Sequence, residues 1–298
     1  MSTSTADLSV ANMKTEEIKE IVKGRYGKAA ERGAKGSCCC PSGAGSGSSF
    51  ATEHGLYGPD ELSQVPEMAR NLSKGCGNPT GFANLHPGEV VVDFGCGAGI
   101  DIILAARKVG PAGKVVGVDF TPQMIERAKQ SAAEAGLTDT VELRIADTER
   151  LDLPDNFADV VISNCVINLC PDKDAVYREA FRILKPGGRL AISDIDYSEK
   201  IDPQVHERFQ ATWAGCVGGA IDEESYFEIV RKAGFGQIEI VIHHPLPPAE
   251  LDEMACCPGP EFTPAPAKEY LDVVEGKVVS VKFTAIKGYG PDSCENVR

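Results

Sequence analysis

Three features are missing from this sequence, and each excludes a class of protein. No stretch of about 18 apolar residues occurs, so the sequence contains no candidate membrane span. Residues 1–10 have neither the basic start nor the apolar centre of a secretory signal, so we expect a cytoplasmic protein. Positive charge is scarce: 30 Lys and Arg face 44 Asp and Glu, a net charge of −14. Such a surface repels phosphates, so neither nucleic acid nor membrane is an expected partner.

Histidine is also rare, whereas cysteine is abundant. None of the five histidines has a metal-ligand spacing from a cysteine, so a structural zinc site is not expected. A chain of 298 residues can bury a core without disulfides, so its eleven cysteines are not needed to stabilise the fold. Some can pack as small buried side chains. Cys38, Cys39 and Cys40 are consecutive in a Gly/Ser-rich stretch without apolar neighbours, which indicates a chemical role.

The pattern along the chain predicts three parts. Residues 1–86 form an appendage, with helices predicted over 15–32 and 59–72 and a low-complexity stretch over 36–49. Residues 87–243 form the core, which alternates between strands and helices. Residues 244–298 form a small, Pro-rich lobe that carries the vicinal pair Cys256-Cys257 and ends in a strand.

The core has the rhythm of a doubly wound α/β protein. Short connections between strands and helices predict parallel strands with right-handed crossovers, and hence a Rossmann-like sheet. Strands are predicted over 89–94, 114–119, 141–145, 158–163, 189–194, 237–243 and 277–286, and helices over 100–109, 122–135, 173–184, 203–214 and 223–233.

A glycine-rich loop follows the first of these strands and opens a helix. It reads Asp93-Phe-Gly95-Cys-Gly97-Ala-Gly99, and glycines there let a ligand approach the backbone. Asp119 ends the second strand, where it can accept hydrogen bonds from two ribose hydroxyls. The dinucleotide fingerprint G-x-G-x-x-G/A is not met, because Ile100 occupies its last position.

Such a loop, with an acid on the next strand, resembles class I methyltransferases that bind S-adenosyl-L-methionine. The resemblance implies that Asp93 helps to hold the methionine amino group and that Asp119 holds the ribose. It also implies that Asp147, after the third strand, accepts from the adenine amino group. Asn164, after the fourth strand, then faces the methyl group, and Tyr57 approaches the cofactor from the appendage.

Three further cysteine motifs make the resemblance more specific. They are Lys74-Gly-Cys76-Gly, Ser163-Asn-Cys165-Val-Ile-Asn-Leu169 and Ala214-Gly-Cys216-Val. Together with the Cys38–Cys40 cluster and the glycine loop, they resemble arsenite methyltransferases over nearly the whole chain. The resemblance implies that Cys76, Cys165 and Cys216 bind arsenic as thiolates. Cys38, Cys39 and Cys40 compete for the role of a fourth, N-terminal cysteine, and Cys39 or Cys40 is preferred.

Thiols suit this chemistry, because trivalent arsenic is a soft centre. Held by three sulfurs, it would direct its lone pair at the methyl group of the sulfonium. The resemblance implies that Cys76 and one N-terminal cysteine then reduce the pentavalent product by forming a disulfide, which thioredoxin or glutathione restores. Cys256-Cys257 either captures arsenite or is inert. Two alternatives stay open: a small-molecule C- or O-methyltransferase, and a non-catalytic thiol-based metalloid-binding protein.

Overall fold

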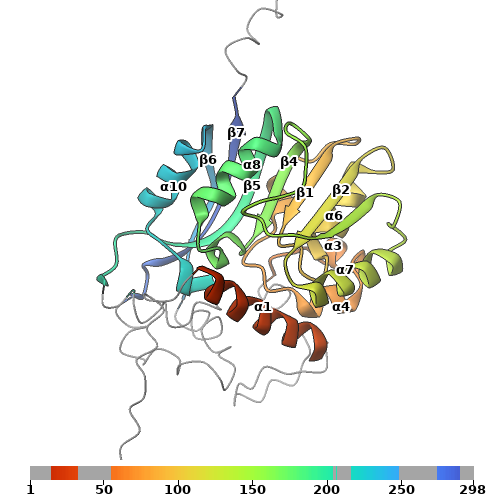
Figure 1. The fold of residues 1–298 in the computed structure, drawn as a ribbon, viewed down its shortest axis with the longest axis horizontal. Coiled ribbons are helices and arrows are strands. Elements are labelled where there is room, and N and C mark those ends of the chain that lie inside the picture. Colours follow the sequence, from red (N-terminus) through yellow and green to blue (C-terminus); the bar gives the residue numbers. More distant parts are fainter. Residues whose placement is uncertain (1–14, 33–54, 204–205, 207–215, 248–273, 289–298) are drawn as a thin grey trace, which may run out of the picture.

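The core of the protein is a mixed sheet with helices on both faces (Figure 1). The computed structural model describes residues 15–32, 55–203, 206, 216–247 and 274–288. Within them, seven strands have the order β3-β2-β1-β4-β5-β7-β6. They are β1 Val90–Phe94, β2 Lys114–Asp119, β3 Val141–Ile145, β4 Ala158–Asn164, β5 Leu184–Tyr197, β6 Phe235–Pro245 and β7 Val278–Lys287. Strands β1 to β5 pair in parallel, and β7 is antiparallel to both β5 and β6. The predicted doubly wound sheet is confirmed.

Helices form a layer on each face of the sheet, and one further helix covers the edge formed by the carboxyl ends of the parallel strands. They are α1 Thr15–Arg32, α3 Pro59–Ser63, α4 Glu67–Leu72, α5 Pro79–Phe82, α6 Ile100–Val109, α7 Pro122–Glu134, α8 Lys173–Ile183 and α10 Glu223–Lys232, with 3₁₀ turns η3 Ile167–Leu169 and η4 Cys216–Gly219. Helices α8 and α10 pack on one face of the sheet, and α6 and α7 pack on the other. Helix α1 lies along the edge where the parallel strands end (Figure 1).

Strand β1 shows why its sequence is an unbroken apolar run. Val91 packs into the layer that contains α6, and Val92 packs into the layer that contains α8. Both are fully buried, because the central strand of a doubly wound sheet has no solvent-exposed face. None of the helices in the described part of the chain combines the length and apolar character of a membrane span.

Two sequence predictions need correction. The helix expected over 59–72 is two helices, α3 and α4, separated at Pro66. Proline lacks a donor and disfavours helical geometry in the residue before it, Val65. The strand expected over 189–194 extends over 184–197, and its register with β4 shifts between Ala158 and Val160. The helix expected over 203–214 falls mostly outside the described residues.

The division into three parts stays a prediction, but the last strand has a definite place. Strand β7 lies inside the sheet, between β5 and β6, and is paired along its length with β5. Cys38, Cys39, Cys40, Cys256 and Cys257 lie outside the described residues.

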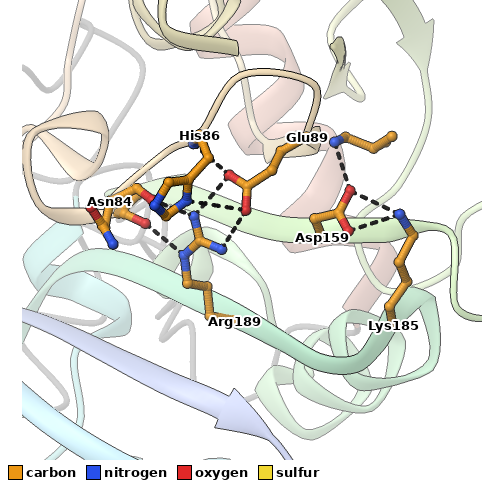
Figure 2. A network of polar contacts seen from close by, with 8 residues as sticks. Asn84, His86, Glu89, Asp159, Lys185 and Arg189 are labelled. Atoms are coloured by element: carbon orange, nitrogen blue, oxygen red, sulfur yellow. Dashed lines mark hydrogen bonds and ion pairs between the residues drawn. The ribbon is translucent and has the colours of Figure 1, made fainter. Parts of the chain in front are cut away.

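A polar network ties together the starts of β1, β4 and β5 (Figure 2). Arg189 binds both carboxylate oxygens of Glu89 at 2.8 and 2.9 Å, and it also donates to the carbonyl oxygen of Asn84. Lys185 pairs with Asp159 at 2.8 Å, and Asp159 accepts from the amide of Val90. Because the network lies at the amino ends of these strands, it supports the fold from the edge opposite the glycine loop.

Candidate active site

The glycine loop lies where β1 ends and α6 begins, and its conformation depends on glycine. Gly95, Gly97 and Gly99 have φ values of +75°, +50° and +104°. A Cβ on Gly95 would lie 2.3 Å from Cγ2 of Val166, so the next loop leaves no room for a side chain there. A Cβ on Gly97 would meet no atom within 4 Å. Gly97 therefore presents bare backbone to open space.

That open space is a cavity of about 950 Å³, a volume that includes its mouth. Of the residues predicted to bind the cofactor, Gly95, Gly97, Asp119, Asp147 and Asn164 line it. Asp93 is buried and, like Gly99, is not part of the lining. The structure therefore brings five of the seven predicted residues to one cavity.

Three buried carboxyl groups, those of Asp93, Asp101 and Asp119, surround the glycine loop. Burial raises the pKa of Asp101 to about 6, although hydrogen bonds from Asn164 and Tyr57 oppose that change. Burial and the charges of Asp101 and Asp119 raise the pKa of Asp93 well above its usual range. Burial also raises the pKa of Asp119, against hydrogen bonds from Thr121 and the amide of Gly97. Repulsion among these groups would be relieved by a cationic ligand.

Asp147 also lines the cavity, and it pairs with Lys19 of α1. Lys19 contacts Asp147 at 2.7 Å and Glu149 at 2.5 Å. Burial alone would lower the pKa of Lys19, but its hydrogen bonds to the two carboxylates raise it. The ammonium therefore stays charged and fastens α1 over the residue predicted to bind adenine.

Two of the predicted arsenic ligands lie together. Cys76 and Cys165 belong to one buried cluster that also contains Val217, the residue after Cys216. Their exposed fractions are 3% and 2%, and Cys165 also lines the cavity. Cys216 begins η4, but its side chain is not described. Cys76 and Cys165 thus share one buried cluster with the residue that follows Cys216 in η4.

The backbone of Cys165 is held in an unusual conformation. Its φ is +61°, a left-handed geometry that residues with a side chain adopt rarely and at a cost of about 1–2 kcal/mol. Its amide donates to the carbonyl oxygen of Ser193 at 2.8 Å. The surrounding structure therefore fixes the direction of this thiol.

The half-buried Asn164 forms a network with the buried residues Tyr57 and Asp101, beside the loop of Cys76. The Tyr57 hydroxyl donates to Asp101 at 2.9 Å, and the Asn164 amide donates to both partners at 3.0 Å. Sequence reasoning did not select Asp101. The available signal was its position, an acid in the first turn of the helix that follows the glycine loop.

Two other cysteines in the cavity wall have a packing role. Cys96 is 5% exposed, and burial together with the charges of Asp119 and Asp93 raises its pKa. Cys170 lies 3.4 Å from the Thr148 hydroxyl, and burial raises its pKa to about 12. Both thiols are therefore protonated at neutral pH and unreactive.

Comparison with known proteins decides the family. The family described as "Methyltransferase domain" matches residues 85–234, which is half of the chain. The chain belongs to this family. It is 39% identical over 78% of its length to an arsenite methyltransferase of Halobacterium salinarum, and 34% identical over 76% to one of Aquipseudomonas alcaligenes. It spans 60% and 64% of those two relatives.

A solved structure extends the likeness to three dimensions. An arsenic(III) S-adenosylmethionine methyltransferase from Chlamydomonas reinhardtii matches with a TM-score of 0.62 and 29% identity, over 78% of this chain and 73% of that one. A putative sarcosine dimethylglycine methyltransferase from Galdieria sulphuraria, at 20% identity and a TM-score of 0.54, shares the fold. The predicted family resemblance and the class of cofactor are confirmed.

The cavity fits S-adenosylmethionine. It lies at the carboxyl ends of β1, β2 and β4 and is lined by the glycine loop, Asp119 and Asn164, the place where ligands of doubly wound sheets bind. Gly97 leaves room beside the backbone, and the acidic surroundings of the glycine loop suit a ligand that carries a sulfonium and an ammonium group. The carboxylate of Asp119 uses one oxygen for Gly97 and the other for Thr121, which leaves lone pairs for ribose hydroxyls.

Proposed function

We propose that this chain methylates trivalent arsenic with S-adenosylmethionine, which converts arsenite into methylated arsenicals for detoxification. The observation that supports it most is the common location of Cys76 and Cys165. They share one buried cluster with the neighbour of Cys216, and Cys165 also borders the cofactor cavity. The names of the relatives support the substrate.

The role of the three thiols follows from arsenic chemistry. Cys76, Cys165 and Cys216 each replace one oxygen of arsenite, which leaves as water, so the arsenic ends with three sulfur ligands and its lone pair. S-adenosylmethionine, when bound, supplies an electrophilic methyl group. The arsenic lone pair held by these three thiolates would accept that methyl group, with S-adenosylhomocysteine as the leaving group, so no residue of the chain would need to act as a general base. The burial of Cys76 and Cys165 excludes water from the arsenic.

The transfer leaves arsenic pentavalent, so two electrons must return it to the trivalent state. In this proposal the thiol of one of Cys38, Cys39 or Cys40, with Cys39 or Cys40 preferred, loses its proton and attacks the sulfur of Cys76. The arsenic–sulfur bond to Cys76 breaks, its electron pair returns arsenic to the trivalent state, and a disulfide forms between the two cysteines. Thioredoxin or glutathione then restores the two thiols by exchange. Because Cys256 and Cys257 are adjacent thiols, we propose for them an accessory capture of arsenite, with an inert role as the alternative. These assignments rest on the resemblance, because the cysteines other than Cys76 lie outside the described residues.

The decisive assay uses purified protein with arsenite, glutathione and methyl-labelled S-adenosylmethionine, followed by chromatographic separation of arsenic species. Labelled methylarsenicals are expected, and Cys76→Ser, Cys165→Ser and Cys216→Ser should each reduce the rate by at least about 100-fold. Cys294→Ser, in the polar C-terminal segment, is the matched control and should retain the activity. Arsenite binding without labelled product would identify a binding protein. Label only on organic acceptors such as quinones would identify a small-molecule methyltransferase.

A further inference from the structure

Asn164, the last residue of β4, uses both ends of its side-chain amide. Its oxygen accepts from the backbone amides of Cys76 at 3.0 Å and Gly77 at 3.1 Å. Its nitrogen donates to the carbonyl oxygen of Gly77 at 2.8 Å and to Tyr57 and Asp101 at 3.0 Å. An amide oxygen has two lone pairs, and here both serve one loop. With the bond to the Gly77 carbonyl, one side chain therefore holds three consecutive peptide groups of the loop that carries Cys76.

The fit between this loop and Asn164 is close. A Cβ on Gly75 would lie 2.3 Å from the Asn164 side-chain nitrogen, and a Cβ on Gly77 would lie 2.1 Å from the Ser193 hydroxyl. Glycine on both sides of Cys76 thus lets the backbone approach its partners directly. The hydroxyl of Ser280 adds a hydrogen bond to the carbonyl oxygen of Cys76 at 3.2 Å.

The partners on the other side fix which way the amide points. Asp101 can only accept while it is ionised, and the Tyr57 hydroxyl already donates to it at 2.9 Å. Both groups therefore require the nitrogen of Asn164 on their side. The oxygen must then face the amides of the Cys76 loop, so a flipped amide would lose contacts on both sides.

We infer that Asn164 is a positioning residue for the thiol of Cys76, which it aims through the backbone of the loop. This role differs from the cofactor contact that the sequence predicts for Asn164. Only the identity of the thiol's ligand rests on the proposed function. The position of the thiol can be measured without arsenite or S-adenosylmethionine.

The test compares alkylation of single thiols in Asn164→Ala and the wild type. Cys76 and Cys96 fall in one tryptic peptide, residues 75–107, so mass spectrometry reports both from the same sample. Limited treatment of the folded protein with N-ethylmaleimide should modify Cys76 at least about 10-fold faster in the variant, and Cys96 less than about 2-fold faster. Tenfold corresponds to about 1.4 kcal/mol. The unchanged Cys96 separates a local effect from global unfolding.

Ser163→Ala is the matched control, because Ser163 is the neighbouring buried residue of β4 and its hydroxyl bonds to Phe94 instead. It should leave the reactivity of Cys76 at the wild-type value. Titration calorimetry gives the second measurement. In Asn164→Ala the Kd for arsenite should rise at least about 10-fold. Because Asn164 also lines the cofactor cavity, the Kd for S-adenosylmethionine is measured in parallel, and it should rise less than the Kd for arsenite.

The inference is overturned if the alkylation rate of Cys76 does not change, or if Cys96 becomes reactive in parallel. Loss of S-adenosylmethionine affinity with unchanged Cys76 would show that Asn164 is a cofactor contact. If Asn164→Ala does not fold, Tyr57→Phe removes one partner of the amide and should raise Cys76 reactivity by a smaller factor. A wild type that methylates no arsenic would refute the proposed function but leave the alkylation result intact.

Discussion

Replacing Gly95 by alanine should lower the stability of the protein for two separate reasons. The first is the positive φ of +75°, which costs an L-residue about 1–2 kcal/mol. The second is the position of the new Cβ, 2.3 Å from Val166, and overpacking of this kind costs about 1–3 kcal/mol. We therefore expect Gly95→Ala to lower the free energy of unfolding by about 2–5 kcal/mol.

Two other glycines provide matched comparisons. Gly136 follows α7 with a φ of +70° and no atom within 4 Å of a Cβ, so Gly136→Ala measures the backbone cost alone. Gly97→Ala should cost the same in stability, but its methyl group enters the cavity and should weaken S-adenosylmethionine binding by about tenfold or more, about 1.4 kcal/mol.

Urea unfolding and calorimetric titration of the three variants check this reasoning. The free energy of unfolding should fall about 1–3 kcal/mol further in Gly95→Ala than in Gly136→Ala. Equal losses in these two variants would show that Val166 moves aside without cost. Unchanged cofactor affinity in Gly97→Ala would show that the ligand does not approach the backbone there.

Three further predictions concern other parts of the molecule. Burial alone would raise the pKa of Glu89, but hydrogen bonds from Arg189 and the His86 amide lower the pKa in the folded protein. The ionised Glu89 therefore stabilises the fold fully above its pKa in the unfolded chain, about 4.3. This stabilisation is lost as the pH falls through the lower pKa of the folded state. Urea unfolding should therefore show Arg189→Met less stable by about 2 kcal/mol at pH 6, with a smaller difference at pH 3. Lys19→Met should speed proteolysis within α1 while core stability falls by less than about 1 kcal/mol, and unchanged proteolysis would contradict the role given to its ion pairs. In urea unfolding, Cys165→Gly should be more stable than Cys165→Ala by about 1 kcal/mol, because only alanine keeps the backbone strain of a φ of +61°. If Cys165→Ala were the more stable variant, the backbone at this position would not be strained.

The sequence predicted the elements whose limits are set by local chemistry. Strand β2 has its predicted bounds, 114–119, because turn residues flank a short apolar run. The helix expected over 59–72 failed because its apolar spacing continued across Pro66, where backbone geometry outweighs periodicity. The antiparallel insertion of β7 between β5 and β6 had no local signal, since pairing partners depend on the whole topology.

The residues of the candidate site were likewise only partly predictable from the sequence. The place of Gly95, Gly97 and Asp119 beside one cavity was predictable because each follows from a position at the end of a strand, whereas their binding roles stay predictions. The network of Asn164 was not, because it joins residues 57, 76 and 101, which only the folded chain brings together. The positive φ of Cys165 was equally hidden, since nothing about a cysteine in sequence indicates a left-handed backbone.

The place of β7 has a consequence for how the protein is made. Ribosomes release a chain from its N-terminus, and β6 emerges well before the strand that must separate it from β5. Until residue 287 has been synthesised, both neighbours expose unpaired backbone. In β6 this backbone lies beside Ile240, Val241 and Ile242, which are exposed in the completed fold as well. A nascent chain stalled in this interval is the form most prone to aggregate, and chaperone demand should peak there.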